Sequence, residues 1–342
     1  MTQEPTVLDD QGEGSSRYRV DVVCLGELLI DLFPGEVGRP LAEVCAFHPA
    51  PGGAPANVAV AASRLGLRAS FIGKVGDDAF GRHLQQVLIS ERVDVRGLRL
   101  DAEARTTLAF IAQPDVNSYE ILFYRNPGAD MLLTREELDR SLLAGTRSFH
   151  FGSISLITEP SRSATLEAVR VAHDAGALIS FDVNYRPTLW PSAGTAREAV
   201  LRVLPMADVV KVNEVELGLL TGTVELRQAS AALLGLGPQL VVVTLGPGGS
   251  YFCCAQGTGY VPAFTVETVD ATGCGDAFVA GLLAGLLASD DWRAQLTVDH
   301  LRRMLRYANA VGALTALKQG VIPALPTAEA VDRFLTEHGP TS

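Results

Sequence analysis

Long apolar runs, paired cysteines and an excess of basic residues are all missing from this sequence of 342 residues. A membrane-spanning helix needs about 18 or more consecutive apolar residues, and no such stretch is present. The five cysteines are scattered and odd in number, without the spacing of zinc ligands. These absences argue against a membrane protein and against a disulfide-held domain, and they favour reduced thiols in a cytoplasmic protein.

Basic residues are the next shortage, because Lys and Arg total 28 against 39 for Asp and Glu, which gives a formal net charge of −11. An acidic chain repels nucleic acid and anionic membranes unless it carries a local basic patch, and no Lys/Arg cluster is visible. Residues 1–18 are polar and acidic, without the basic start and apolar stretch of a signal peptide. We expect a disordered tail there, and small molecules rather than nucleic acid or membrane as partners.

From residue 20 onward the sequence contains a regular alternation of two kinds of segment. Short runs rich in Val, Ile and Leu predict strands at residues 20–25, 70–72, 148–151, 178–181, 209–211 and 240–244. Helical spacing predicts helices at residues 56–65, 80–89, 161–173, 193–204 and 276–288. Continuous apolar strands separated by helices indicate an α/β fold in which helices cover both faces of a mostly parallel sheet, within one domain over residues 19–340.

Two segments interrupt this alternation, at about 33–50 and 103–125. The first is rich in Pro and Gly, and the second alternates like half-exposed antiparallel strands. We predict that they pair as a small β-sheet that forms a lid over one edge of the core. The alternative is a surface hairpin without a role in function.

The segment with the clearest chemical signal is VDATGCGDAFV, residues 269–279. Gly273 and Gly275 flank Cys274, and an apolar helix follows at once. Small residues at a helix N-terminus let backbone N–H groups converge on an anion, with Asp276 in the first helical turn. The alternative is an ordinary helix start with an acidic residue that suits the helix dipole. The phosphate-binding pattern G-x-x-x-x-G-K-[ST] and the dinucleotide pattern G-x-G-x-x-G after the first strand are both absent.

Four more segments place polar residues or glycines where ligands bind. The sequence PGGAPAN, residues 51–57, stands directly before a helix, so Gly52 and Gly53 permit close backbone approach and Asn57 offers a donor and an acceptor. Residues 181–190, 211–217 and 244–250 each follow a predicted strand, and open α/β sheets bind ligands beyond the carboxyl ends of strands. Each segment alone is also explained as a turn or a helix cap, so only their combination indicates a site.

Taken in order, these segments resemble the ribokinase-like carbohydrate kinases of the PfkB family. Two signature regions carry the resemblance, PGGAPANVAVAASRLG at residues 51–66 and DATGCGDAFVAG at residues 270–281. A closer resemblance to plant and bacterial fructokinases lies in CLGELLID, FYRNPGADMLL, FHFGSISLI, FDVNYRPTLW, KVNEVEL and ANAVGALTALKQGVIPALP. The resemblance spans roughly residues 20–335. It implies a three-layer α/β/α sandwich with a small β-sheet lid, and transfer of the γ-phosphate of ATP to a sugar hydroxyl.

The resemblance also implies roles for individual residues. Asp276 matches the general base, and the amides of Gly273, Cys274 and Gly275 match the anion hole. Asp31, at the end of the first strand, matches a carboxylate that binds sugar hydroxyls. The other residues expected to bind the sugar are Gly52, Gly53, Asn57, Arg125, Asn126 and Asp130. The second signature reads D-A-T-G-C-G-D where the family usually has D-T-x-G-A-G-D, and these changes alter side chains where the family uses backbone amides.

On the nucleotide side, the resemblance implies a set of residues for ATP and Mg²⁺. They are Asn184, Arg186, Lys211, Asn213, Glu216, Thr244, Gly246, Gly248, Gly249 and Asn309. Many family members also use a potassium ion beside the anion hole. The positions that match that site are Asp270, Thr272, Thr315, Lys318 and Gly320, whereas Ala324 replaces a Ser of some relatives.

The sequence leaves three hypotheses of function open. The first is an ATP-dependent fructokinase, active as a homodimer if the lids of two subunits pack together as in many relatives. The second is a kinase for another sugar or sugar acid, such as ribose or 2-keto-3-deoxygluconate. The third is a catalytically dead sugar-binding or regulatory relative, which the presence of Asp276, Gly273 and Gly275 disfavours.

Overall fold

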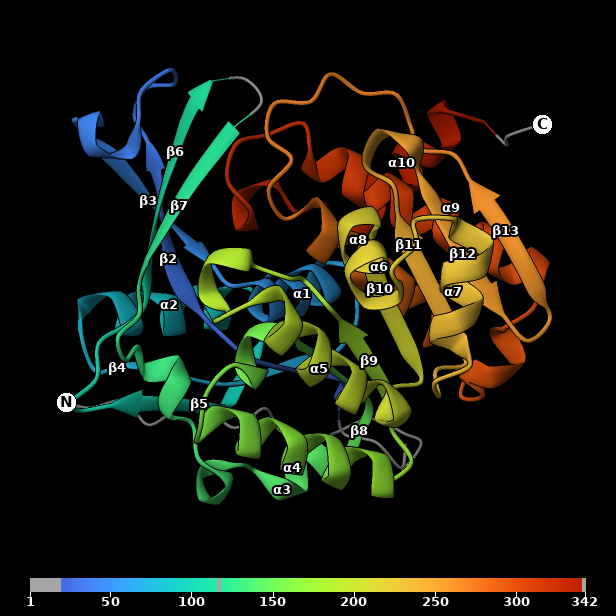
Figure 1. Ribbon diagram of the computed structural model, residues 1–342, viewed down its shortest axis with the longest axis horizontal. Helices are drawn as coiled ribbons and strands as arrows, with labels where there is room; N and C mark the ends of the chain where they lie inside the picture. Colours follow the sequence, from blue (N-terminus) through green and yellow to red (C-terminus); the bar gives the residue numbers. More distant parts are fainter. Residues whose placement is uncertain (1–19, 116–117, 340–342) are drawn as a thin grey trace.

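The computed structural model describes residues 20–115 and 118–339, and the tail predicted at residues 1–18 lies outside the described residues. A nine-stranded sheet forms the core, with strand order β13-β12-β11-β10-β9-β8-β1-β4-β5 (Figure 1). The seven strands from β11 to β5 in this order pair in parallel. Strand β12 is antiparallel to both of its neighbours, β11 and β13. The strands are β1 Val20–Leu25, β4 Ala69–Gly76, β5 Asp94–Asp101, β8 Thr146–Gly152, β9 Leu178–Asp182, β10 Val209–Asn213, β11 Leu240–Thr244, β12 Ser250–Cys254 and β13 Gly257–Val261.

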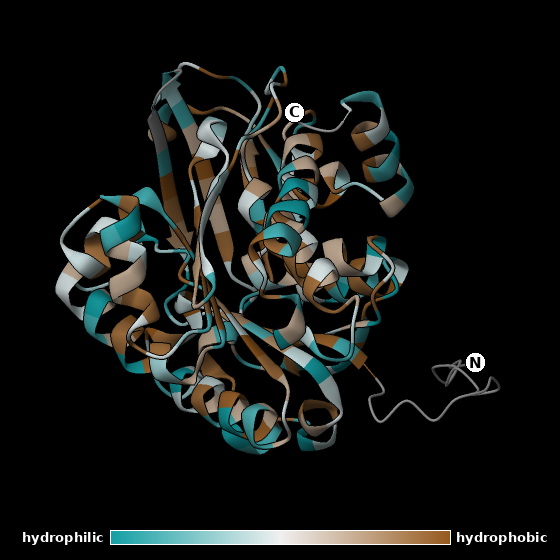
Figure 2. Ribbon diagram, turned by 90° about the vertical axis from the view of Figure 1, so that its right-hand side faces the viewer, coloured by the Kyte–Doolittle hydropathy of each residue, from teal (hydrophilic) through white to brown (hydrophobic). Residues whose placement is uncertain are grey.

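Helices cover both faces of this sheet. One apolar cluster joins the sheet to α1, α2, α8, α9 and α10, and a second joins it to α3, α4, α5, α6 and α7. In Figure 2 the strands at the centre of the molecule are largely brown, as expected for a sheet buried between two helical layers. The helices are α1 Ala54–Arg64, α2 Ala79–Ser90, α3 Arg140–Ala144, α4 Ser161–Asp174, α5 Ala193–Val203, α6 Glu214–Thr221, α7 Leu226–Leu234, α8 Cys274–Leu286, α9 Val298–Thr315 and α10 Ala328–Glu337.

Strand β1 illustrates why the sheet needs two helical layers. Val22 and Cys24 belong to one apolar cluster, whereas Val23 and Leu25 belong to the other. Successive side chains of a strand point to opposite faces, so an unbroken apolar run is stable only where both faces are covered. The three-layer α/β arrangement predicted from these runs is therefore confirmed.

A separate four-stranded sheet, with order β3-β2-β6-β7, extends from one edge of the core (Figure 1). Its strands are β2 Leu29–Pro34, β3 Phe47–Gly52, β6 Leu108–Asp115 and β7 Ser118–Tyr124. A small second sheet is therefore present, as predicted. Strand β2 begins at Leu29, however, and it pairs with β6 through residues 30–32, just before the predicted segment 33–50. The pairing between β2 and β6 is parallel, however, whereas the other two pairings are antiparallel.

One sequence prediction placed Asp31 at the end of the first strand, and this placement is wrong. Strand β1 ends at Leu25, and Asp31 lies inside β2 of the small sheet. The chain changes direction at Gly26, which has φ 155° and packs against Pro55. The apolar character of CLGELLID runs through this break, which explains why the sequence alone suggested a single strand.

The ends of the other predicted elements agree with the structure to within a few residues, and the five cysteines are free as expected. Across the described parts of the chain, none of the helices has both the length and the apolar character required for a bilayer span.

Stability should depend strongly on Phe151, near the carboxyl end of β8. Its ring stacks on Phe149 at 5.8 Å and on Phe181 at 4.7 Å between centroids, and it is fully buried. Phe151→Ala should lower the free energy of unfolding by about 3–5 kcal/mol, because the truncation leaves a cavity. Urea unfolding measures this loss. Phe80→Ala is the matched control, since Phe80 is 40% exposed, and an equal loss in both variants would contradict the assignment.

Candidate active site

The candidate site lies where the carboxyl ends of the parallel strands meet the start of helix α8. Asp276 stands in the first turn of that helix, and only 7% of the residue is exposed. Asn57, in the first turn of α1, donates from Nδ2 to Oδ2 of Asp276 at 2.8 Å. Two segments separated by 219 positions therefore meet at one carboxylate, and they are the two segments singled out from the sequence.

The loop before α8 has the backbone geometry that the sequence predicts. Gly273 caps the helix with φ 78°, a left-handed conformation that favours glycine. A Cβ at Gly273 would also approach Cγ1 of Val321 to 2.2 Å, so space and backbone both require glycine. Burial raises the pKa of the Cys274 thiol to about 12, with the carboxylates of Asp270 and Asp276 adding to the rise. Cys274 therefore stays a neutral thiol, and its backbone rather than its side chain suits an anion.

Asp31 of the small sheet lies against the glycine pair at the end of β3. A Cβ at Gly52 would fall 2.0 Å from Oδ2 of Asp31, so the carboxylate occupies space that only glycine leaves open. Gly53 has φ 107°, and a Cβ there would meet the carbonyl oxygen of Glu27 at 2.4 Å. The structure therefore brings Asp31 and the glycine pair to the helix that carries Asn57.

The charge of Asp276 acts on Asp31, and Arg186 acts on both carboxyls. Burial raises the pKa of Asp276 to about 6, with Asp182 adding to the rise, while the Asn57 hydrogen bond and the cations Arg186 and Lys211 oppose it. Burial likewise raises the pKa of Asp31 to about 7; the charge of Asp276 adds to this, and Arg186 opposes it. Asp31, Asp276 and Arg186 thus belong to one electrostatic site.

A buried lysine stands beside the anion loop. Nζ of Lys211 lies 3.1 Å from Oδ1 of Asp182, and it is 3.2 Å from the point where Gly275 would carry a Cβ. Burial is the largest single influence and would lower the pKa of Lys211, but the charges of Asp182, Glu216 and Asp276 together with the Asp182 hydrogen bond outweigh it and raise that pKa. Lys211 therefore keeps its positive charge at neutral pH, within reach of an anion bound at the start of α8.

The turns after β9 and β10 are held together by Glu216. Its two carboxylate oxygens accept from the backbone N–H groups of Tyr185 at 2.7 Å and Asn213 at 2.8 Å. Asn213 in turn caps α6 by accepting from the N–H of Glu216. Asn184 has φ 39°, a conformation that costs energy for a residue other than glycine and that recurs at functional sites. These predicted nucleotide residues therefore lie together on two neighbouring strand ends.

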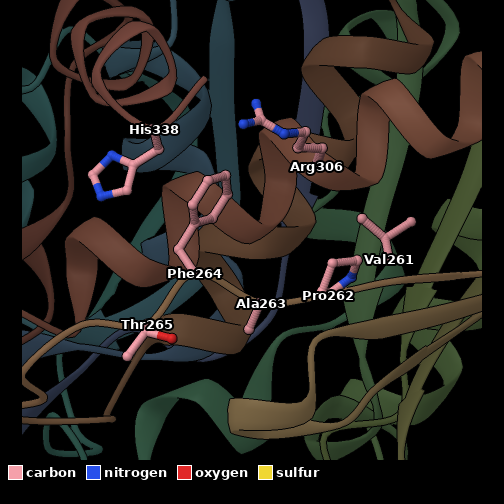
Figure 3. Close-up of a pocket in the computed structure, with 7 residues that line it drawn as sticks. All are labelled: Val261, Pro262, Ala263, Phe264, Thr265, Arg306 and His338. Carbon is pink, nitrogen blue, oxygen red and sulfur yellow. The ribbon is translucent and has the colours of Figure 1, made fainter. Parts of the chain in front are cut away.

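The remaining predicted nucleotide residues surround the β11–β12 turn. Thr244 ends β11, Gly246–Gly248 forms a short 3₁₀ helix, and Gly249 has φ 101°. Asn309 of α9 donates to the carbonyl oxygens of Val261 and Pro262, at 3.2 and 3.1 Å. A cavity of about 250 Å³ borders these carbonyls (Figure 3). Its lining residues are Val261, Pro262, Ala263, Phe264, Thr265, Arg306 and His338.

Both halves of the predicted potassium site are adjacent. Oδ1 of Asp270 accepts from the amide and the hydroxyl of Thr272, and Oδ2 accepts from the amide of Gly320 at 3.1 Å. The hydroxyl of Thr315 is instead directed to Val311 within its own helix, and Lys318 is exposed. The side chain of Asp270 therefore joins the two loops, which leaves backbone carbonyls as the groups available to a cation.

Arg125 and Asp130, predicted to bind the sugar, are buried and paired with each other. Nε of Arg125 donates to Oδ2 of Asp130 at 2.7 Å, and Oδ1 of Asp130 accepts from the hydroxyl of Thr107 at 2.6 Å. Asn126, between them in sequence, is exposed. The structure thus places the pair just after the end of β7, where both carboxylate oxygens of Asp130 accept hydrogen bonds from other side chains of the protein.

Sequence reasoning passed over two charged residues of this region, Asp182 and Glu27. Asp182 is the partner of Lys211, and its signal was an acidic residue that closes an apolar strand. Glu27 is buried beside the glycine pair, with Oε1 accepting from the N–H of Ala54 at 3.0 Å. An acid between two apolar runs, in CLGELLID, was the available signal, and it did not distinguish a buried side chain from an exposed one.

The comparisons with known proteins agree with this geometry. Residues 19–328 match the family described as pfkB family carbohydrate kinase. The probable fructokinase-2 of Arabidopsis thaliana is 48% identical over 307 residues, which cover 90% of this chain and 93% of that protein. The fructokinase of Xylella fastidiosa with bound ATP has a TM-score of 0.85 and 35% identity, covering 93% of this chain and 98% of that chain.

A second solved structure comes from Vibrio cholerae O395. It is a fructokinase double mutant in a form with fructose, ADP and potassium ion bound, with a TM-score of 0.83 and 34% identity, covering 94% of this chain and 99% of that chain. These likenesses confirm the ribokinase-like three-layer α/β fold. Together with the sequence match over most of the chain, they establish that the chain belongs to the PfkB family of carbohydrate kinases.

Proposed function

We propose that this chain is an ATP-dependent fructokinase, which transfers the γ-phosphate of ATP to the 6-hydroxyl of D-fructose. The observation that carries the proposal is the buried carboxylate of Asp276 at the start of α8. It accepts a hydrogen bond from Asn57, and its charge acts on the carboxyl of Asp31. A relative 48% identical over most of this chain is named as a fructokinase, which supports fructose as the acceptor.

In the proposed mechanism, Asp31 and the backbone around Gly52 and Gly53 hold the sugar hydroxyls. Asp276 accepts the proton of the attacking hydroxyl, and the amides at Gly273, Cys274 and Gly275 donate to the phosphoryl group in transfer. Lys211 and Arg186 supply positive charge beside that group. The small sheet acts as a lid that excludes water from the sugar.

The chain's residues suit Mg²⁺ only as an ion carried by ATP. Within residues 20–115 and 118–339, no group of three or more His, Cys, Asp and Glu side chains could hold a metal ion. Both oxygens of Glu216 already accept from backbone amides, so Glu216 and Asn213 would contact the ion through water. Mg²⁺ often binds in this way, mainly through phosphates and water, and it would supply neutralisation of the phosphate charge.

Three further expectations belong to the same proposal. The loops joined by Asp270 support a potassium site built from backbone carbonyls. The exposed side chains of Leu122 and Tyr124 on β7 support a homodimer through the small sheet. The five free cysteines support a cytoplasmic protein. The net charge of −11 supports a protein that binds neither nucleic acid nor membrane.

A sugar panel tests the proposed function directly. ADP release is measured with ATP and Mg²⁺ and with fructose, ribose, glucose, tagatose, adenosine or 2-keto-3-deoxygluconate, each with and without potassium. Selective turnover of fructose is expected. Turnover of a different sugar would retain the kinase mechanism and overturn the substrate. If fructose binds and no sugar is turned over, the hypothesis of a catalytically dead, regulatory sugar-binding protein replaces that of a kinase.

Asp276→Asn should abolish most of the turnover while leaving fructose binding nearly intact. The amide cannot accept the hydroxyl proton, and general-base catalysis typically contributes about 10²–10⁴ in rate. Steady-state kcat and fructose binding by calorimetry separate the two effects. The variant keeps the side-chain shape, so folding should be preserved. A kcat close to that of the unmodified enzyme would refute Asp276 as the base.

Acid should inactivate the enzyme at an unusually high pH. The pKa of Asp276 is raised to about 6 because the carboxylate is buried, so the carboxyl is already protonated when the pH falls below that value. Only the deprotonated form accepts a proton, and kcat at saturating fructose should therefore fall about tenfold per pH unit below the pKa. A profile from pH 5 to 9, with folding checked at each pH by circular dichroism, measures this. Constant activity down to pH 5 would contradict the prediction.

A further inference from the structure

The small sheet is joined to the core by four stretches of chain, and each contributes to one buried polar cluster. The four crossings are residues 26–28 between β1 and β2, residue 53 between β3 and α1, residues 102–107 between β5 and β6, and residues 125–128 after β7. The groups that they bring together at the root of the lid are Glu27, the N–H of Ala54, Thr107 and Arg125, with Asp130 just beyond the last crossing.

Hydrogen bonds connect these crossings in pairs. Glu27 Oε1 accepts from the N–H of Ala54, which ties the first crossing to the second. Asp130 accepts from Thr107 on one oxygen and from Arg125 on the other, which ties the third crossing to the fourth. The N–H of Ile30, in β2 two residues beyond the first crossing, donates to the carbonyl oxygen of Thr107 in the third crossing at 3.2 Å. The root of the lid is therefore one connected unit.

The cluster holds more negative than positive groups. Arg125 is the cation, and its guanidinium pairs with Asp130 at 2.7 Å. Glu27 is 4% exposed, and its Oε2 is buried without a hydrogen-bond partner. An ionised carboxylate in that position would be a buried and unbalanced charge, which is costly. Burial raises the pKa of Glu27 to about 7, and the charge of Asp130 adds to the rise while Arg125 opposes it.

We propose that Glu27, through the hydrogen bond that its side chain accepts rather than through a charge, is a positioning residue that fixes the root of the lid and thereby the sugar pocket. Its carbonyl oxygen packs on Gly53, and its side chain holds the first N–H of the helix that carries Asn57. Asp31 follows four residues later in the lid strand. Removing the Glu27 carboxyl would release the glycine pair and Asp31 together, without touching the nucleotide residues. This inference rests on the proposed function for its kinetic test.

The kinetic test compares Glu27→Ala with Glu27→Gln. The alanine variant should raise KM for fructose about tenfold, because small displacements of positioning groups are costly, while KM for ATP changes less than about twofold. The glutamine variant keeps the shape and the acceptor oxygen without any charge, so its KM for fructose should stay within about threefold of the unmodified value. An unchanged KM in the alanine variant would overturn the proposal, and so would equal damage in the glutamine variant, which would show that the charge is needed.

Asp21→Asn is the matched control. Asp21 is a buried carboxylate at the other end of β1, paired with Arg68 at 3.1 Å. Its loss should lower thermal stability without changing either KM. If Asp21→Asn raised KM for fructose as much as Glu27→Ala at equal loss of stability, Glu27 would have a structural role only and the proposal would fail.

Two further measurements keep the proposal testable if Glu27→Ala does not fold or if fructose is not the substrate. Hydrogen exchange of the Ala54 and Ile30 amides needs no sugar, and it should be as slow in Glu27→Gln as in the unmodified protein. Between pH 7 and 9, exchange corrected for its intrinsic pH dependence should accelerate in the unmodified protein, as Glu27 ionises, and not in Glu27→Gln. Identical corrected profiles would overturn the proposal, whereas absence of fructose turnover in the unmodified protein would overturn only the proposed function.

Discussion

Burial of the Asp276 carboxylate is the constraint to which the rest of the site is matched. A carboxylate removed from water is costly unless hydrogen bonds or opposite charges compensate it. Here the compensation comes from Asn57, from the cations Arg186 and Lys211, and from the N-terminal end of α8. The compensation is incomplete, so the pKa of Asp276 stays above that of an ordinary aspartate. A stronger base at neutral pH is the result, which is the property a general base requires.

The same balance explains why charged residues accumulate at one edge of the sheet. Lys211 can be buried there because Asp182 pairs with it, and Asp182 would itself be unbalanced without the lysine. Parallel strands bring these groups together, since their carboxyl ends all finish at one edge. The fold therefore gathers buried charged side chains at one edge of the sheet, and the apolar strands around them fix their positions.

The fold and the centre of the site could be predicted from sequence to a large degree. Residues 22–25 of strand β1 and 277–286 of helix α8 are continuous apolar runs, and such runs leave few alternatives to burial in a layered α/β fold. Gly273 and Asp276 lie only three positions apart in sequence, so a local pattern contains their geometry. The Asp31 placement failed for a related reason, because one apolar stretch continues across the change of direction at Gly26 into a second sheet.

What sequence could not predict is which distant residues pair. The bond from Asn57 to Asp276 joins segments 219 positions apart, and its existence depends on how α1 and α8 pack. Arg125 and Asp130 were expected to bind the sugar, and their pairing with each other at the end of β7 is a contact that the local sequence pattern does not reveal. Glu27 was invisible for the same reason, since burial of a lone acid depends on the three other chain crossings around it.

The root of the lid shows why such pairings matter for a sugar kinase. A lid must move to admit substrate, and yet Asp31 must return to the same position relative to Asp276 in each cycle. In the proposed function, motion in the outer part of the small sheet would satisfy the first need, and the bonded cluster at its base would satisfy the second. A cluster of hydrogen bonds suits this purpose better than apolar packing, because hydrogen bonds specify direction as well as distance. The buried polar groups at Glu27, Thr107 and Asp130 are therefore best understood as determinants of geometry rather than of stability.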